Sequence, residues 1–349
     1  MRRVWLLVTA VLLSGCGQLG YLSQSLSGHL RLMSVARPVD DWLAQQDPSL
    51  ALTPQLRERL VLSQRIRYFA TASLHLPDNR SYRRYADLKR GAAVWNVVAT
   101  PALSLTLTTS CFPVMGCVGY RGFFDRAAAD AHAKTLRDQG LDVMVYGVPA
   151  YSTLGWSNWI GGDPLLNTFI NYPEGELAQM IFHELAHQVA YAADDTAFNE
   201  AFATSVERLG AQAWLQSQAS PAAQAEYRAG LARRERFRAL THHTREQLAA
   251  LYASPLDDAA KRAAKATLLQ QLREQQTASA DRAYDGWIDR ANNASFALLS
   301  AYADLSPAFE VLFERLGSDW PRFYTEVQRL AALPKPERRA QLESTRKGD

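Results

Sequence analysis

The sequence is poor in cysteine, in charge of one sign and in long hydrophobic runs. Its 349 residues include only 3 cysteines and carry a formal net charge of +3. The low cysteine content excludes a disulfide-rich scaffold, and the even scatter of arginine leads us to expect no nucleic-acid partner. There is no glycine-rich phosphate loop, internal repeat or low-complexity linker. With 48% hydrophobic residues, the chain has the composition of a globular protein with a substantial core.

The N-terminus has the pattern of an export signal. Two arginines precede an apolar stretch from Val4 to Leu13, which is too short to span a bilayer because a spanning helix needs about 20 residues. The tetrapeptide that ends in Cys16 resembles a bacterial lipobox, which implies cleavage before Cys16 and lipidation of this residue. An ordinary signal peptide with an incidental cysteine is the alternative. Gly17 stands where an inner-membrane retention signal often has Asp, so the analogy favours the outer membrane.

This signal divides the chain into three parts. We expect a signal peptide at residues 1–15, a lipidated tether at 16–36 and a folded domain at 37–349. No later apolar run is long enough to span a bilayer. The lipid is therefore the expected contact with the membrane, and the domain is expected on the periplasmic side of the bacterial envelope.

The expected domain alternates between two kinds of pattern. Apolar residues recur at helical spacing over 37–73, whereas alternation with period two predicts strands over 92–108 and later within a sheet-containing part at about 92–160. The pattern at about 165–349 is overwhelmingly helical, and its stretch at 220–282 predicts a long helical hairpin at the surface. We therefore expect a predominantly α-helical α+β fold.

The domain contains two cysteines, Cys111 and Cys117. Pro113 and Gly116 between them favour a reversal of the chain that brings the two Cα atoms within bridging distance. An oxidising compartment permits a disulfide, which we expect because no histidine ligand set lies nearby in the sequence. Two reduced buried thiols and a soft metal site are the alternatives.

The pattern with the clearest chemistry is His183-Glu184-Leu185-Ala186-His187. The two histidines are one helical turn apart, so both imidazoles reach the same metal ion. The glutamate that follows the first histidine lies beside the ion, where it can accept a proton from a metal-bound water. Apolar residues at helical spacing around the motif favour a helix. Two core histidines that only form hydrogen bonds are the alternative.

A second segment supplies a third ligand. A turn and a helix cap at 194–196 separate the motif from a second predicted helix, which carries Glu200 and Glu207. A helix–turn–helix of this length brings Glu200 back over the two histidines and completes a known catalytic arrangement for one Zn²⁺ ion. Glu207 lies two turns further on the same face, where it can orient one of the histidines. A surface pair between Glu207 and Arg208 is the alternative.

These two segments resemble the gluzincin metallopeptidases. The segment from Asn199 to Glu207 is similar to the third-ligand helix of zinc aminopeptidases with an Asn-Glu-Gly-Phe-Ala signature, although the spacer is shorter and Ala201 replaces the glycine. A closer resemblance is to a family of predicted bacterial aminopeptidases that are lipoproteins of about this length. It includes the lipobox, both cysteines of the domain and the segment 292–294, and covers most of the mature chain. We therefore expect a gluzincin-like domain with a small β-sheet packed against the HExxH helix.

The resemblance and the residue chemistry imply the same mechanism. Zinc held by His183, His187 and Glu200 lowers the pKa of its water towards about 7. Glu184 accepts a proton, the hydroxide attacks a peptide carbonyl, and Glu184 passes a proton to the leaving amine.

Such sites usually add a tyrosine or histidine that assists at the oxyanion. Tyr302, on a predicted helix rich in small residues, is the first candidate, and a half-buried core tyrosine is the alternative. Tyr191 and His132 are weaker candidates. The extended segment at 151–159 is either an edge that binds an extended peptide or an ordinary core strand.

The expected function is a membrane-anchored zinc peptidase that acts on peptides or proteins, and the family resemblance favours an aminopeptidase. An aminopeptidase binds the free α-amino group of its substrate, for which Glu174, Glu176 and Asp163 are candidates. A zinc endopeptidase acting on envelope proteins, a zinc hydrolase for another bond and a non-catalytic lipoprotein scaffold or chaperone are the alternatives. The intact ligands and base argue against the scaffold.

Overall fold

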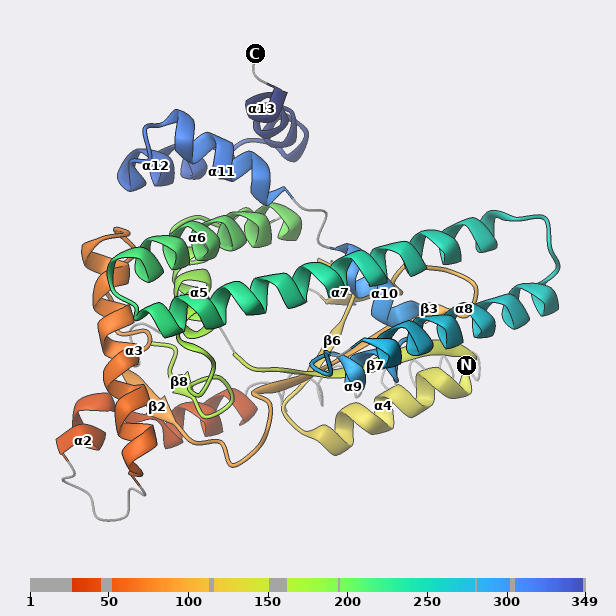
Figure 1. Cartoon of the computed structure of the whole chain (residues 1–349), viewed down its shortest axis with the longest axis horizontal. Coiled ribbons are helices and arrows are strands. Elements are labelled where there is room, and N and C mark those ends of the chain that lie inside the picture. Colours follow the sequence, from red (N-terminus) through yellow and green to blue (C-terminus); the bar gives the residue numbers. More distant parts are fainter. Residues whose placement is uncertain are drawn as a thin grey trace, which may run out of the picture.

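Helices form most of the computed structural model, which describes residues 27–44, 52–112, 116–150, 162–193, 195–279, 281–301 and 305–347 (Figure 1). Residues 27–35 are helical, and the helices that follow are α2 (Val39–Ala44), α3 (Pro54–Ala72), α4 (Arg126–Asp138), α5 (Glu174–Ala186), α6 (Thr196–Ser217), α7 (Pro221–Ala253), α8 (Asp258–Ala278), α9 (Asp285–Ile288), α10 (Asn293–Ala301), α11 (Ser306–Arg315), α12 (Trp320–Ala331) and α13 (Lys335–Lys347). The strands are β1 (Arg37–Pro38), β2 (Arg84–Ala86), β3 (Val94–Pro101), β4 (Ser110–Phe112), β5 (Gly116–Val118), β6 (Arg121–Phe123), β7 (Leu141–Val148) and β8 (Leu165–Leu166). This is the predominantly helical α+β class that the sequence predicts. Within the described ranges, no helix combines the length and the apolar character that crossing a membrane requires.

Local signals in the sequence set the helix ends. The hydroxyl of Thr53 caps α3 by accepting a hydrogen bond from the amide of Leu56 (3.1 Å), and Pro54 occupies the first turn, as predicted. α4 is capped in the same way by Asp125. The chain then leaves the helix at Gly140, whose φ of +81° lies in the left-handed region that favours glycine.

β3 is the central strand of an antiparallel sheet in the order β6-β3-β7. Because side chains alternate along a strand, Val97 points to the face that is covered by α4, and Val98 points to the opposite face, where α10 packs. The strand predictions are confirmed over β3 and β7. The prediction of a strand continuing to residue 108 is wrong, because β3 ends at Pro101, whose nitrogen has no hydrogen to donate to a strand ladder.

The prediction that this sheet packs against the HExxH helix is wrong for the strands that the structure describes. The two faces of the sheet are already covered by α4 and α10, and α5 packs instead on α3, α6 and α7. A second, very short sheet in the order β1-β2-β8 contributes Leu165 and Leu166 to the core that surrounds α5. The metal ligands therefore lie in a helical part of the fold.

α6 lies between α5 and the C-terminal helices (Figure 1). Its Phe198 and Phe202 pack against Phe309 of α11, and Phe202 also contacts Phe323 of α12. These four aromatic side chains are fully enclosed. The C-terminal helices thus hold α6 in place from the side opposite to α5.

α7 and α8 form the predicted helical hairpin, in which α7 crosses the molecule and packs on α5 and α6, and α8 packs on α9 (Figure 1). The first half of α7 packs closely on α5. A Cβ atom at Gly175 would lie 2.5 Å from the ring of Tyr227, so this close approach requires a glycine. The hairpin therefore forms one side of the helical part that contains α5.

Buried polar groups fix α10 onto the sheet. The amide of Asn293 donates to the carbonyl oxygen of Ala102 (2.9 Å) and accepts from the hydroxyl of Tyr252 (2.7 Å). Its backbone nitrogen donates to Asp142 (3.0 Å), which is also paired with Lys265 (2.5 Å). The segment 292–294, which carries part of the family resemblance, therefore stabilises the fold in this region.

The helix at residues 27–35 packs on the rest of the protein. Leu32, Met33 and Ala36 belong to the main hydrophobic core. This part of the expected tether is therefore packed on the domain.

Candidate metal centre

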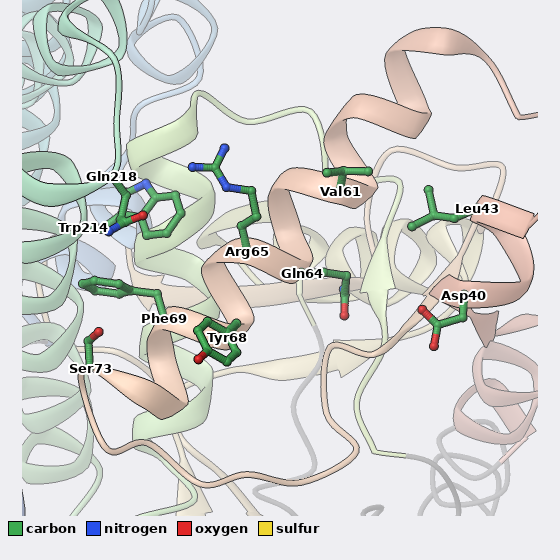
Figure 2. A pocket seen from close by; sticks show the side chains of 10 residues that line it. All are labelled: Asp40, Leu43, Val61, Gln64, Arg65, Tyr68, Phe69, Ser73, Trp214 and Gln218. Carbon is green, nitrogen blue, oxygen red and sulfur yellow. The ribbon is translucent and has the colours of Figure 1, made fainter.

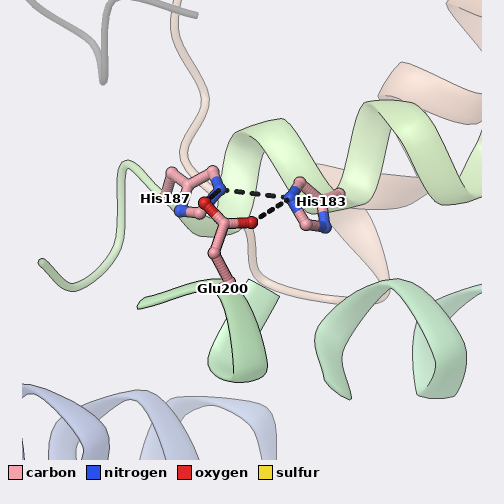
Figure 3. A group of neighbouring side chains, drawn as sticks. All are labelled: His183, His187 and Glu200. Carbon is pink, nitrogen blue, oxygen red and sulfur yellow. Dashed lines mark hydrogen bonds and ion pairs between the residues drawn. The ribbon is translucent and has the colours of Figure 1, made fainter. Parts of the chain in front are cut away.

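Two histidines at the C-terminal end of α5 have ring nitrogens that converge on one position. His183 and His187 are one helical turn apart, and their Nε2 atoms lie 3.1 Å from each other (Figure 3). His183 is half-buried and His187 is buried. When both imidazoles carry their hydrogen on Nδ1, each of the two facing Nε2 atoms has a lone pair, and a cation can then bind between them.

Glu200 on α6 completes the group. Its carboxylate oxygens lie 3.4 Å from the Nε2 of His183 and 3.8 Å from the Nε2 of His187 (Figure 3). Tetrahedral zinc with bonds of about 2.0–2.1 Å places its ligand atoms about 3.3 Å apart. Two imidazole nitrogens and a carboxylate at these distances therefore fit a zinc ion, and the structure brings together the three residues that the sequence predicts as ligands.

The turn between α5 and α6 is held by the residue that precedes Glu200. The side-chain amide of Asn199 accepts from the backbone nitrogen of Ala192 (2.8 Å) and donates to its carbonyl oxygen (2.8 Å). Both groups are buried. This pair of hydrogen bonds sets where α6 begins relative to α5, and so it determines where Glu200 lies.

Asp195 caps α6 and connects it to the C-terminal helix. Its carboxylate accepts from the amide of Phe198 (3.2 Å), from Arg338 (3.1 Å) and from Arg339 (2.8 Å), the last two on α13. Burial raises the pKa of Asp195, but the hydrogen bonds from Arg339, Phe198 and Arg338 outweigh it and lower this pKa below its usual value. The ionised carboxylate therefore stabilises the start of the ligand helix.

Glu207 contacts Nδ1 of His183, the ring nitrogen that does not face His187. One of its carboxylate oxygens lies 2.8 Å from the Nδ1 of His183, which is therefore assigned as a donor. This tautomer leaves Nε2 free to bind a metal. The alternative of a surface pair with Arg208 does not describe this contact, and Arg208 lies 3.3 Å from Glu310.

The pKa values of His183, His187 and Glu200 show that these side chains bind one proton in the absence of a metal ion. Burial alone lowers the pKa of His183, but its hydrogen bonds with Glu200 and Glu207 raise this pKa well above 6.5. Burial, together with the neighbouring His183, lowers the pKa of His187 to about 4. Burial raises the pKa of Glu200, but the hydrogen bond with His183 outweighs it and lowers this pKa. Without metal, the group therefore holds one proton close to the position that an ion would take.

The turn that follows α5 contacts a different segment of the chain. Gln188 in this turn donates to the hydroxyl of Ser81 (3.3 Å) and accepts from the amide of Asn79 (2.6 Å). The carboxylate of Glu184 acts electrostatically on His183 and on Tyr82. The predicted base therefore lies near enough to His183 and to Tyr82 to influence the pKa of each.

Several other predicted site residues lie elsewhere. Tyr302, Cys16 and the candidate edge strand at 151–159 are outside the described residues. Tyr191 is exposed to solvent, and His132 lies on α4, which covers the sheet.

The three acidic candidates for amine binding have different surroundings. Glu174 accepts a hydrogen bond from the indole nitrogen of Trp214 (2.9 Å), and Glu176 is paired with Arg234 (3.1 Å). Asp163 is buried. Glu174 and Glu176 thus already have protein partners.

The cysteines of the domain lie on a short hairpin. In the register of β4 and β5, Cys111 is directly opposite Cys117. The disulfide between them stays a prediction.

A hollow of about 510 Å³ lies away from the metal ligands, between α2, α3 and the end of α6 (Figure 2). Tyr68 and Trp214 line it, and the guanidinium of Arg65 lies over the Trp214 ring at 5.7 Å. None of the three ligand residues lines this hollow. It is therefore separate from the metal centre.

The fold and the site define a class: a predominantly helical α+β protein in which two histidines and a glutamate are placed to hold a metal ion. The chain belongs to the family described as "Putative aminopeptidase", whose model matches residues 20–342. This match supports the peptidase class that the sequence resemblance implies. The curated proteins and the solved structures contain no match to the chain.

Proposed function

We propose that the protein is a zinc-dependent aminopeptidase. The observation that carries the proposal is the convergence of His183, His187 and Glu200, with all ligand atoms within 4.8 Å of one another, in a member of a peptidase family. Glu184 adjoins the first ligand on the same helix. A ligand set with an adjacent base is the arrangement that metal-dependent hydrolysis of a peptide bond needs.

The residues of the chain have separate roles in this proposal. His183, His187 and Glu200 hold the zinc ion, which supplies Lewis acidity at the substrate carbonyl and makes a water more acidic. Glu184 accepts the proton of the attacking water and delivers a proton to the leaving amine. Glu207 keeps the Nε2 of His183 directed at the ion through its 2.8 Å contact with Nδ1.

We further propose that the enzyme acts at the periplasmic side of the outer membrane. The support is the N-terminal pattern of two arginines, a short apolar run and a lipobox that ends in Cys16. Lipidation of Cys16 attaches the domain to the membrane, and peptides or proteins of the envelope are its substrates. A gluzincin type of peptidase is proposed on the HExxH motif followed by a helix that carries the third ligand, Glu200.

The experiment that tests the proposal measures zinc content and peptide cleavage on the same samples. We expect about one zinc ion per chain in the wild type and in Glu184→Gln, but a marked loss of zinc in Glu200→Ala. Cleavage should fall by about 10²–10⁴-fold in Glu184→Gln, because the base is removed while the ligands remain. Glu310→Gln, a change on α11 of a carboxylate outside the ligand group, is the matched control and should leave both quantities unchanged.

A second comparison separates aminopeptidase from endopeptidase activity. The same peptides are offered with a free or an acetylated N-terminus, and an aminopeptidase cleaves only the free form. Equal cleavage of both forms would favour the endopeptidase. A wild-type protein that takes up no zinc at micromolar concentration and cleaves neither form would overturn the proposal and favour the scaffold.

A further inference from the structure

Tyr82 has a hydroxyl group whose hydrogen bond is not accounted for by the fold. The side chain is 1% exposed, and its oxygen is enclosed without a hydrogen-bond partner among the described residues. An enclosed hydroxyl without a partner loses its hydrogen bonds to water and so destabilises the folded state. A phenylalanine at this position would avoid this cost, so the hydroxyl calls for an explanation.

The backbone around Tyr82 is held in an uncommon conformation. Its φ is +64°, which is strained for a bulky aromatic residue. The backbone nitrogen of Tyr82 donates to the carbonyl oxygen of Asp163 (2.7 Å), and its own carbonyl oxygen accepts from Gln64 (3.0 Å). These contacts on both sides of the residue fix the direction in which its side chain leaves the backbone.

A buried arginine organises the segment that leads to Tyr82. The guanidinium of Arg67, whose side chain is 1% exposed, donates to the carbonyl oxygens of Pro77 (2.7 Å), Asn79 (3.3 Å) and Ser81 (3.1 Å). On its other side the segment is closed by Gly162, where a Cβ atom would lie 2.4 Å from the backbone nitrogen of Ser81. The segment 77–82 is therefore a rigid part of the fold.

This rigid segment is attached to the turn that directly follows α5, the helix that carries Glu184. Gln188, which lies in this turn four residues after Glu184, forms hydrogen bonds with Ser81 and Asn79. Burial raises the pKa of Tyr82 well above 10, and the negative charges of Glu184 and Asp163 raise it further. The phenol is therefore protonated at neutral pH and available as a donor to a nearby carboxylate.

We propose that Tyr82 is a positioning residue for the base: its enclosed hydroxyl donates a hydrogen bond, through one bridging water, to the carboxylate of Glu184. This inference rests on the proposed function. A carboxylate held in this way keeps one orientation towards the ligand group. The strained backbone and the buried arginine are then explained as the means of delivering one hydroxyl group to the base.

The first test replaces the hydroxyl alone. In Tyr82→Phe we expect kcat to fall by about 10–100-fold, with KM within twofold of the wild type and with zinc content unchanged, because the ligands are intact and the hydroxyl does not touch the substrate. Tyr324→Phe is the matched control. Its hydroxyl is also buried but donates to the carbonyl oxygen of Leu74 (2.8 Å) in the main core, so its removal should leave kcat, KM and zinc content at wild-type values.

The second test needs no activity. Thermal unfolding of the chelator-treated protein is measured for Tyr82→Phe, Glu184→Gln and the double variant. If the two side chains interact, the change in Tm of the double variant differs from the sum of the single changes by about 2 °C or more. The same cycle with Tyr324→Phe in place of Tyr82→Phe should be additive.

The outcomes distinguish this inference from the function on which it rests. Zinc binding and peptide cleavage by the wild type, together with a wild-type kcat in Tyr82→Phe or an additive cycle, would overturn the inference and leave the proposed function intact. Loss of zinc in Tyr82→Phe would also overturn it, because the residue would then maintain the ligand group rather than the base. A wild type without zinc and without cleavage would overturn both.

Discussion

The metal centre and the sheet region both contain buried polar side chains, but they use them differently. Around the sheet, Asn293 and Asp142 hold α10 through a closed set of hydrogen bonds and an ion pair. In the metal centre, the Nε2 atoms of His183 and His187 converge to 3.1 Å, and the Nδ1 of His187 is enclosed without a hydrogen-bond partner among the described residues. Polar groups that are all paired with one another stabilise a fold, whereas two ring nitrogens and a carboxylate that converge on one point can also hold an ion.

The largest effect on zinc binding is expected at Glu207, whose carboxylate contacts the Nδ1 of His183. Removing it in Glu207→Ala leaves Nδ1 of His183 without its acceptor, so the ring loses its fixed orientation. We expect zinc affinity to fall by about 10–100-fold, measured by competition with a chromophoric chelator. Glu207→Gln retains an oxygen acceptor and should have an intermediate effect. Zinc affinity of Glu207→Ala equal to that of the wild type would show that the 2.8 Å contact does not support the ligand group.

Zinc affinity is also expected to depend on pH, because a protonated His183 cannot bind the ion. The pKa of His183 is raised well above 6.5 in the metal-free protein, so below this raised value a proton occupies the nitrogen that zinc must bind. Zinc affinity should therefore fall about tenfold for each pH unit below that pKa, and it should level off above it. Titrations with zinc at several pH values measure this slope. Affinity independent of pH between 6 and 8 would contradict the charge state that we assign to His183.

The smallest effect on zinc affinity is expected from a substitution in the sheet region. Asn293→Ala leaves the partners of this amide unsatisfied, which should lower the free energy of unfolding by about 1–3 kcal/mol while zinc affinity stays unchanged. The matched variant is Asn199→Ala, where the same change loosens the turn that places Glu200 and should weaken zinc binding as well. Denaturant unfolding and zinc titration of both variants test the contrast. Equal zinc affinities in the two variants would remove the distinction between the regions.

Signals that act over short distances along the chain could be predicted from the sequence. The cap at Thr53, the helical hairpin formed by α7 and α8, and the one-turn spacing of His183 and His187 all depend on neighbouring residues. The return of Glu200 over the histidines also follows from a short spacer, since few turns of that length are sterically possible.

Features that depend on contacts between distant segments could not be predicted. The strands within 92–160 have an apolar face towards α4 and another towards α10, and no local pattern shows which helix covers a strand. The position of Tyr82 depends on Arg67 and on Gly162, which lie far apart in the sequence. In the sequence, Tyr82 has no distinctive spacing from other residues that would indicate a functional role. Its enclosed hydroxyl indicates such a role, and only the folded structure reveals this feature.

The two arginines on α13, Arg338 and Arg339, affect when the metal ligands become firmly placed during synthesis of the chain. A chain is synthesised from its N-terminus, so all three metal ligands exist before Arg338 and Arg339 do. Until α13 is present, Asp195 lacks two of the groups that donate hydrogen bonds to it, and only the amide of Phe198 remains to hold this cap at the start of α6. Chains that lack α13 therefore hold the helix that carries Glu200 less firmly, so a firmly assembled ligand group requires this C-terminal helix.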